Sequence, residues 1–427
     1  MKRAASLSLV AALVFSGGVS LFGQERGPDN GGRDAIGASD SASAGAERPG
    51  QLVRAARVGD RDIFIPGSSI EGVADRGVRA HTNHAIALQP MATAGGPQGE
   101  TPASLRAVYG NLTSTGGAGV IAVVDAYDYP TAAADLYAFS TQFGLPSACI
   151  QTGACFQTIY GGGKKPAADC GWAQESALDI EWAHAMAPNA KIVLVEAASS
   201  SFSDLFQAVD AASAYIAAHG GLGEVSMSWG GAEFRGENSY DSHFSTKSGS
   251  VVFFASSGDT GGQTIYPATS ANVVAAGGTR INRSSSGAFL SETAWSGSGG
   301  GSSPYELRPS FQVGISGIVG NSRGVPDLSF DADPNSGVAV YDSTVCQRMS
   351  GWMVFGGTSV AAPSLAGVAN LAGHFYLNSA IELGNIYATG DAADFRDITS
   401  GTAGRYQAKP GWDFVTGVGS PLGTAGK

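Results

Sequence analysis

A serine near the C-terminal third of the chain lies in a setting that suits nucleophilic chemistry. Residues 356–363 have the sequence GGTSVAAP and lead into a mostly apolar stretch. Glycine permits a tight turn and a close approach of backbone to a substrate. A serine at the start of a buried helix lies where free N–H groups favour negative charge. Ser359 is therefore predicted to be a nucleophile, and a simple N-cap serine is the alternative.

Two carboxyl groups, Glu175 and Asp179, are four residues apart in a stretch that favours a helix. On a helix this spacing places both on one face, within reach of each other. Two negative charges so close oppose each other, so the pKa of one carboxyl should rise. A carboxylate can serve as a general base in acid, where a histidine is protonated. The alternative is an ordinary solvated acidic face.

These two motifs together carry a family resemblance. The Gly-Thr-Ser stretch resembles the nucleophile motif that subtilisins and sedolisins share, and the chain has no His-Gly-Thr-His stretch of the subtilisin kind. With the acid pair it resembles the sedolisin family of serine-carboxyl peptidases over roughly residues 101–421. The resemblance implies a subtilisin-like α/β fold, with helices on both faces of a mostly parallel central sheet. It also implies that Glu175 takes the proton from Ser359 and that Asp179 orients Glu175 and shares its proton.

Two further stretches resemble parts of a sedolisin active site. Residues 255–261 have the sequence ASSGDTG, where an aspartate beside glycine is ordinarily turn chemistry. The resemblance implies that Asp259 helps to build the oxyanion hole. A carboxylic acid donates a hydrogen bond only when protonated, so such a hole works best in acid. Residues 226–231 resemble the edge that pairs with the substrate backbone. That edge makes substrate-binding candidates of Trp229, Gly230 and Gly231, with core packing as the alternative for Trp229.

The C-terminal stretch resembles the sedolisin calcium site. The resemblance implies one structural calcium ion, because calcium prefers six to eight oxygen ligands in irregular loops. Lys409 stands where the family commonly has glycine. Two ordinary turn aspartates are the alternative. The implied ligands are the carboxylates of Asp397 and Asp413 and the backbone carbonyls of Ile398, Lys409 and Gly411.

Alternating strand and helix patterns must position these motifs. Such alternation predicts a parallel sheet covered on both faces, with the active site at the carboxyl ends of its strands. Strands are expected at residues 119–125, 191–197, 224–229, 250–255 and 272–276, and helices at 131–144 and 203–218. The four cysteines allow three pairings, of which we favour Cys149–Cys155 and Cys170–Cys346.

The N-terminal part of the chain predicts export. Residues 1–23 have the layout of a secretory signal peptide, with two basic residues before an apolar run. Residues 24–100 are predicted to be a disordered linker and a short pro-segment. His81 and His84 have a metal-like spacing, but no third ligand is suggested nearby, so ordinary loop histidines are expected. The peptidase domain is expected to occupy residues 101–427.

The sequence as a whole predicts a secreted serine-carboxyl endopeptidase with an acidic pH optimum. The net charge is −11 and no basic patch is present, which argues against nucleic acid as a partner. We expect a monomer that acts on proteins or peptides, with no membrane attachment after signal cleavage. One alternative is a subtilisin-type protease that uses Asp125 with His184. The other is an inactive sedolisin-like shell that binds peptides.

Overall fold

The computed structural model describes residues 53–58, 61–88, 97–246, 248–389 and 393–427. The predicted signal peptide and most of the predicted linker lie outside these residues. None of the helices in the described ranges combines the length and the apolar character that crossing a membrane requires.

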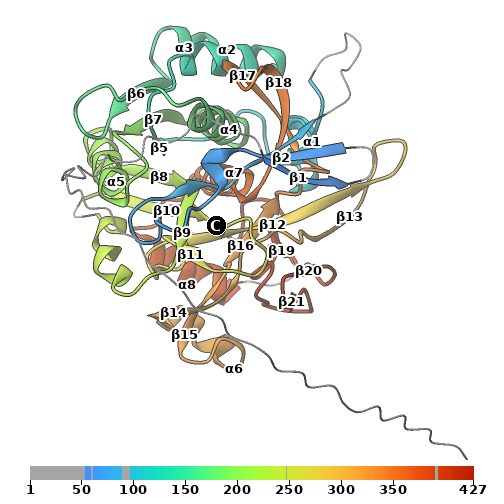
Figure 1. The fold of residues 1–427 in the computed structure, drawn as a ribbon. Helices are drawn as coiled ribbons and strands as arrows, with labels where there is room; N and C mark the ends of the chain where they lie inside the picture. The colour runs from blue at the N-terminus through green and yellow to red at the C-terminus, as the bar shows by residue number, and fades with distance from the viewer. Residues whose placement is uncertain (1–52, 59–60, 89–96, 247, 390–392) are drawn as a thin grey trace, which may run out of the picture. The chain divides into compact units, whose positions relative to one another are not determined.

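A large, mostly parallel sheet forms the centre of the described structure, in the order β13-β12-β10-β8-β5-β7-β6, with β16 beside β12 (Figure 1). Its neighbouring strands run parallel, apart from the antiparallel pair β12 and β13. Every residue of β5 is buried, as expected of a parallel strand covered on both faces. The predicted α/β class is confirmed. The strands are β5 (Val120–Ala126), β6 (Phe156–Tyr160), β7 (Lys191–Ala197), β8 (Leu222–Met227), β10 (Ser250–Ser256), β12 (Val274–Arg283), β13 (Phe289–Ala294) and β16 (Leu328–Asp331).

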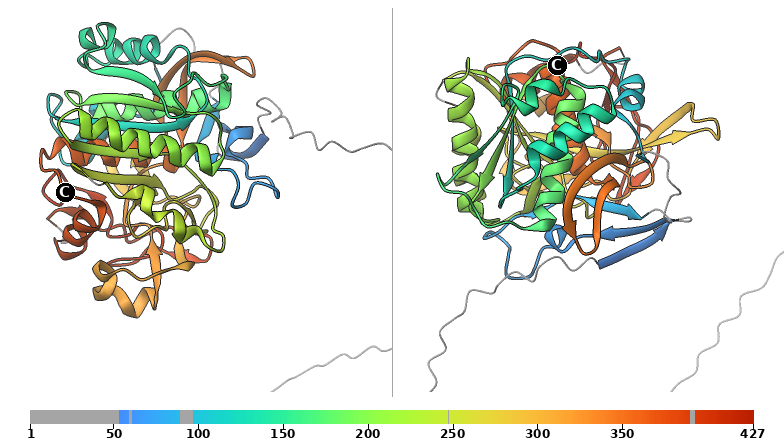
Figure 2. Two further views of the ribbon diagram at one scale, coloured as in Figure 1. Left: turned by 90° about the vertical axis from the view of Figure 1, so that its left-hand side faces the viewer. Right: turned by 90° about the horizontal axis from the view of Figure 1, so that it is seen from above.

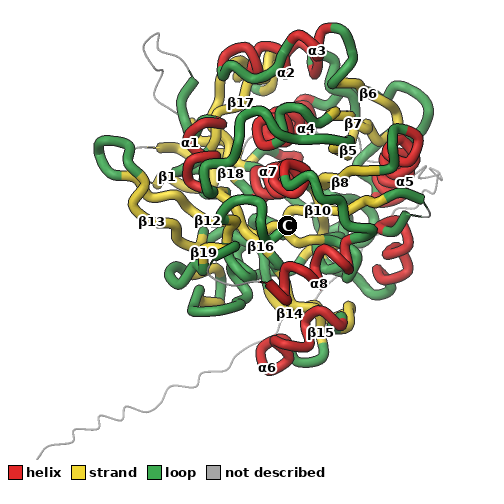
Figure 3. The backbone as a smooth tube through the Cα atoms, turned by 180° about the vertical axis from the view of Figure 1, so that it is seen from behind, coloured by secondary structure: helices red, strands yellow, loops and turns green. Residues whose placement is uncertain are grey.

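Two hydrophobic cores lie on the two faces of this sheet. On one face, Ile121 and Val123 of β5 pack with α4 (Cys170–Met186) and α7 (Thr358–Leu371). On the other face, the alternate residues Ala122 and Val124 pack with α5 (Phe202–Ala218). Figure 2 shows α5 and the α2 and α4 pair on opposite sides of the strands. Helices α4 and α7 lie side by side (Figure 3). The other helices are α1 (Pro102–Val108), α2 (Ala132–Gln142), α3 (Ala148–Gln151), α6 (Ser316–Val319) and α8 (Ser379–Thr389).

The predicted elements correspond closely to the observed ones, with one instructive difference. The strand expected at residues 224–229 is two strands, because Ser228 leaves the ladder between β8 and β9 (Trp229–Ala232). This break turns the chain at the carboxyl end of β8, where the active site is expected. Both favoured disulfide pairings are confirmed, and Cys170–Cys346 ties the first residue of α4 to the end of β17.

The described part of the predicted linker and pro-segment contains four strands: β1 (Val53–Val58), β2 (Arg61–Ile65), β3 (His81–Thr82) and β4 (Ala85–Leu88). Strands β1, β2 and β4 extend an antiparallel sheet with β18 (Met349–Gly356) and β17 (Val338–Cys346), while β3 pairs with β9 (Figure 1). This N-terminal segment therefore packs directly on the peptidase region. The small strands are β11 (Ile265–Tyr266), β14 (Gly301–Leu307), β15 (Ser322–Val325), β19 (Phe395–Arg396), β20 (Thr402–Ala403), β21 (Tyr406–Gln407) and β22 (Ser420–Pro421).

Candidate active site

The acid pair lies on a helix that is buried on all sides. Asp169 caps the N-terminus of α4, and its side chain accepts hydrogen bonds from the backbone N–H groups of Gly171 and Trp172. From its second residue onward the helix is buried, and Glu175 and Asp179 have no exposed surface. The alternative of a solvated acidic face is therefore wrong. Carboxyl groups buried this deeply must either keep their protons or accept hydrogen bonds from buried donors, because an isolated buried charge costs folding free energy.

Ser359 lies one residue inside α7, after a turn that requires glycine. Strand β18 ends at Gly356, and Gly357 has a φ of 107°. A Cβ on Gly357 would collide with the carbonyl oxygen of Asn83 and with Oδ2 of Asp259. The hydroxyl of Ser359 donates to the carbonyl oxygen of Ser228 at 3.3 Å. The predicted nucleophile is thus held at a helix N-terminus, beside the break between β8 and β9.

Ser228 joins the nucleophile to the acid helix. Its Oγ donates to Oδ1 of Asp179 at 2.8 Å, while its carbonyl oxygen accepts from Ser359. Burial raises the pKa of Asp179 well above its ordinary value, and the charges of Asp125 and Glu175 raise it further. This shift favours the protonated form of Asp179.

Asp259 lies directly beside the nucleophile turn. Its Oδ1 accepts hydrogen bonds from the backbone N–H and the hydroxyl of Thr358, both at 2.8 Å. Its Oδ2 is buried and has no hydrogen-bond partner among the described residues. Burial raises the pKa of Asp259 to about 8, against the opposing effect of the two Thr358 donors. Below that pH, Asp259 carries a proton and can donate it to a ligand in a hydrogen bond.

Glu175 has a partner that the sequence analysis missed. Oε2 of Glu175 lies 2.6 Å from Nδ1 of His84, and both side chains are fully buried. The expectation that His84 is an ordinary loop histidine is therefore wrong. The apolar residues AIAL that follow His84 were the available signal, since they form β4 and carry the histidine into the interior.

The Asp125–His184 pair of the subtilisin-type alternative is not brought together. Asp125 is buried near the end of β5, and burial followed by the charge of Glu175 raises its pKa well above the ordinary value. His184 instead directs Nε2 to the carbonyl oxygen of Pro146 at 3.0 Å. Burial lowers the pKa of His184 to about 4. Asp125 thus belongs with the carboxyl cluster of Glu175 and Asp179.

The predicted substrate edge contains one core side chain and two buried glycines. Trp229 is fully buried, its Nε1 donates to the carbonyl oxygen of Val124 at 2.7 Å, and its ring packs on Phe202 and Phe206. Core packing therefore describes its side chain. Gly230 and Gly231 pair through their backbone with β3 on one side and β11 on the other.

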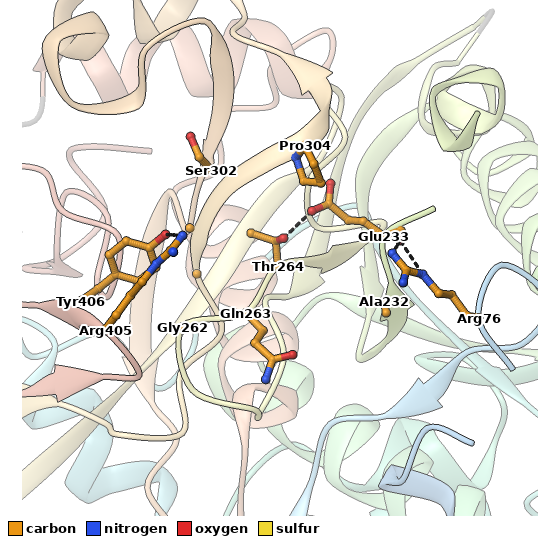
Figure 4. A pocket seen from close by; sticks show the side chains of 12 residues that line it. Arg76, Ala232, Glu233, Gly262, Gln263, Thr264, Ser302, Pro304, Arg405 and Tyr406 are labelled. Atoms are coloured by element: carbon orange, nitrogen blue, oxygen red, sulfur yellow. Dashed lines mark hydrogen bonds between the residues drawn. The ribbon is translucent and has the colours of Figure 1, made fainter. Parts of the chain in front are cut away.

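A polar hollow of about 290 Å³ lies at the end of β9 (Figure 4). The hydroxyl of Thr264 donates to Oε2 of Glu233 inside it, and Arg76 donates to the carbonyl oxygen of Glu233 from Nε at 3.0 Å and Nη2 at 2.6 Å. Arg405 and Tyr406 form the opposite wall. Because Arg76 belongs to the N-terminal segment, that segment contributes directly to the surface beside the substrate edge.

Hydrogen bonds connect two pairs of the predicted calcium ligands. Oδ2 of Asp397 accepts from the backbone N–H of Gly411, and Oδ2 of Asp413 accepts from that of Lys409, both at 2.9 Å. Ile398 packs its side chain into a small core with Val415. Within the described ranges no three or more His, Cys, Asp or Glu side chains gather as a metal site would require. A site here would therefore rely on two carboxylates supplemented by backbone carbonyls, an all-oxygen set that suits calcium.

Comparisons with known proteins agree with this geometry. The model of the subtilase family matches residues 159–419. Sedolisin from Pseudomonas sp. (strain 101) is 35% identical over 172 residues, which cover 36% of this chain and 28% of that protein. Kumamolisin from Bacillus sp. (strain MN-32) is 32% identical over 290 residues, which cover 58% of this chain and 49% of that protein. The matched regions thus span about half or less of these curated relatives.

A solved structure resembles this chain over more of its length. Pseudomonas sedolisin, described as a serine-carboxyl proteinase complexed with two molecules of pseudo-iodotyrostatin, superposes with a TM-score of 0.63 and 26% identity. The superposition covers 77% of this chain and 96% of that one. The subtilisin-like form of the predicted fold is thereby confirmed. The chain belongs to the subtilase family and, within that fold, to the sedolisins.

Proposed function

We propose that the chain is a secreted serine-carboxyl endopeptidase that cleaves proteins at an acidic pH optimum. The observation that carries the proposal is the double role of Ser228, whose hydroxyl donates to Asp179 and whose carbonyl oxygen accepts from Ser359. It connects a helix-start nucleophile to a buried acid pair. The description of Pseudomonas sedolisin as a serine-carboxyl proteinase supports the same chemistry.

The resemblance to the sedolisins supports a role for each group. Ser359 attacks the carbonyl carbon of the scissile peptide, and Glu175 removes its hydroxyl proton and later gives it to the leaving amine. Asp179 holds a proton next to Glu175 and so fixes the geometry of the base. The negative oxygen of the intermediate is stabilised by the backbone N–H of Ser359 and by protonated Asp259.

An acidic optimum follows from the buried acids. The pKa of Asp259 is raised to about 8, so its donor is present in acid and is lost as the pH rises through that value. The pKa of Asp179 is also raised well above its ordinary value, which favours its protonated form in acid. Both effects favour catalysis at low pH over catalysis in alkali.

A calcium ion would serve to hold the C-terminal loops. The carboxylates of Asp397 and Asp413 would bind it, together with the carbonyls of Ile398, Lys409 and Gly411. When bound, the ion supplies electrostatic cross-linking of loops and takes no part in bond cleavage. Export through the predicted signal peptide and a monomeric state complete the proposal.

The test is a pH–rate profile on a denatured protein substrate, with Glu175→Gln and Glu181→Gln run alongside the parent. Glu181 lies on the same buried helix, and its pKa is raised well above the ordinary value, so glutamine mimics its protonated form. We expect an acid optimum, a loss on the order of 10⁴-fold for Glu175→Gln, and near-parental activity for Glu181→Gln. An optimum above neutral pH that survives Glu175→Gln would refute the carboxyl-base mechanism.

A further inference from the structure

We infer that Ile265 restricts the peptidase to substrates with a small side chain on the residue before the cleaved bond. The inference rests on the proposed endopeptidase function and names the class of bond that it cuts. It comes from the place of Ile265 in the candidate active site, where one side chain touches two glycines that lie far apart in the sequence.

The position of the reacting carbonyl follows from the two proposed oxyanion donors. The backbone N–H of Ser359 donates to the carbonyl oxygen of Asn83 at 3.0 Å. A Cβ on Gly357 would lie 2.2 Å from this oxygen and 2.5 Å from Oδ2 of Asp259, so both donors lie beside the same oxygen. Asn83 therefore marks where a substrate places the residue before the cleaved bond.

The side chain of Asn83 shows where such a residue points. Its Nδ2 donates to Oγ of Ser256 at 2.8 Å, and Asn83 is 1% exposed. Ser256 is the last residue of β10, one residue past Ala255, which lies opposite Met227 at the end of β8. The side chain thus enters a slot between the carboxyl ends of β8 and β10, where ligands of such a sheet are expected.

Ile265 of β11 closes this slot. A Cβ on Gly230 would lie 2.5 Å from Cδ1 of Ile265, and a Cβ on Gly258 would lie 3.2 Å from the same atom. Gly230 comes shortly after β8 and Gly258 shortly after β10, so one methyl group packs against the continuation of both strands. Ile265 itself is 4% exposed and belongs to the core on the α5 face of the sheet.

A slot closed in this way accepts only a short side chain. Neither glycine has room for a methyl group beside Ile265, so a long substrate side chain would have to displace the isoleucine. Isoleucine is branched at Cβ and has few accessible rotamers, and forcing extra volume into a packed core is unfavourable. An asparagine fits and also gains the hydrogen bond to Ser256. We therefore expect Asn and Ala to be preferred over Leu and Phe.

The experiment uses the full chain in acid with four peptides that differ only at the residue before the cleaved bond, which is Asn, Ala, Leu or Phe. Mass spectrometry locates the cut. The parent should show kcat/KM values for Asn and Ala at least about 10²-fold above the value for Phe. Ratios of kcat/KM between two peptides do not depend on the fraction of active molecules.

The decisive variant is Ile265→Ala, with Ile281→Ala as the matched control. Ile281 is also 4% exposed, but it packs in the core on the other face of the sheet. Ile265→Ala should raise the ratio of Phe to Asn cleavage by at least about tenfold, and Ile281→Ala should leave it at the parental value. If Ile265→Ala does not fold, Ile265→Val should shift the ratio in the same direction by a smaller factor.

The hydrogen bond to Asn83 is tested by Ser256→Ala. This variant removes the acceptor and should lower the ratio of Asn to Ala cleavage by about threefold to tenfold. An unchanged ratio would show that Asn83 does not mark the substrate slot, and it would overturn the inference.

Equal cleavage of the Phe and Ala peptides by the parent would also overturn the inference, as would the same ratio for the variants at Ile265 and Ile281. A denatured protein added to the same samples separates these failures from failure of the proposed function. If the parent cuts the denatured protein without regard to side-chain size, the inference alone is wrong. If a folded parent cuts neither the peptides nor the denatured protein at any pH, the endopeptidase function is wrong and the inference falls with it.

Discussion

Carboxyl groups are used in opposite ways in the catalytic cluster and in the C-terminal loops. At the nucleophile turn, Oδ2 of Asp259 is buried and has no hydrogen-bond partner among the described residues, and burial raises the pKa of Asp259 to about 8. In the loops, Oδ1 of Asp413 accepts from the backbone N–H groups of Val415 and Thr416, and Oδ2 accepts from Lys409. One carboxyl keeps an oxygen without a hydrogen bond from the described residues, while both oxygens of the other accept from the backbone.

This difference distinguishes a carboxyl group suited to catalysis from one that stabilises a loop. A buried polar atom without a partner costs folding free energy, so such an atom is expected where a ligand or a reacting group will satisfy it. A carboxylate that binds several backbone N–H groups instead fixes the path of a loop. Changes in the cluster should therefore reduce activity, and changes in the loops should reduce stability.

After Glu175→Gln, the largest effect is expected at Asp259. Asp259→Ala removes one of two oxyanion donors and should lower kcat by about 10²–10³-fold. Asp259→Asn keeps a donor that does not titrate, so it should retain a larger share of its activity above pH 8 than the parent does, since the parent loses its donor there. Activity across pH on a peptide substrate tests both. Equal losses for the two variants at every pH would show that Asp259 has only a structural role.

Calcium removal should lower the stability of the C-terminal loops. EDTA should lower the Tm of the parent by several degrees, and it should change the Tm of Asp413→Asn much less because that variant lacks one charged ligand. Asp394→Asn, in the same C-terminal segment, is the control and should respond as the parent does. Activity per folded molecule should stay near the parental value. An unchanged parental Tm in EDTA would remove the calcium proposal.

The dependence of stability on pH should come mainly from the buried carboxyl groups of the catalytic cluster. Burial raises the pKa values of Asp179 and Asp259 in the folded state, so the folded state binds more protons than the unfolded chain between about pH 4 and pH 8. Stability from these groups is present below that window and is lost as the pH rises through it. The Tm should fall toward pH 8, and Asp259→Asn should fall less steeply. Parallel curves for the two proteins would contradict this assignment.

The smallest effect is expected for Lys409→Gly. The side chain is exposed, and the proposed ligand is the backbone carbonyl, which glycine also provides. The Tm should change by less than it does on calcium removal, because surface substitutions usually alter stability by about 0.5 kcal/mol or less. A larger decrease would mean that the lysine side chain itself stabilises the loop.

The sequence by itself determined the features whose cause is local. Residues 191–197 form a short, continuous apolar run rich in Val and Ile, which is typical of a buried parallel strand, and the spacing of Glu175 and Asp179 places both on one helical face. The glycines before Ser359 indicate a tight turn for the same local reason. The motifs therefore predicted the fold, and the site residues that they indicate stay a prediction.

Only the tertiary structure decided what fills the site. His84 meets Glu175 across 91 positions of the sequence, and Asn83 meets Ser256 across 173. Neither contact has a local period or propensity, because each depends on β3 and β4 pairing with strands far along the chain. The burial of α4 also depends on a segment far along the chain. Its acidic residues suggest a solvated face, but α7 packs against them. Long-range packing, unlike helix spacing, leaves no pattern in a single sequence.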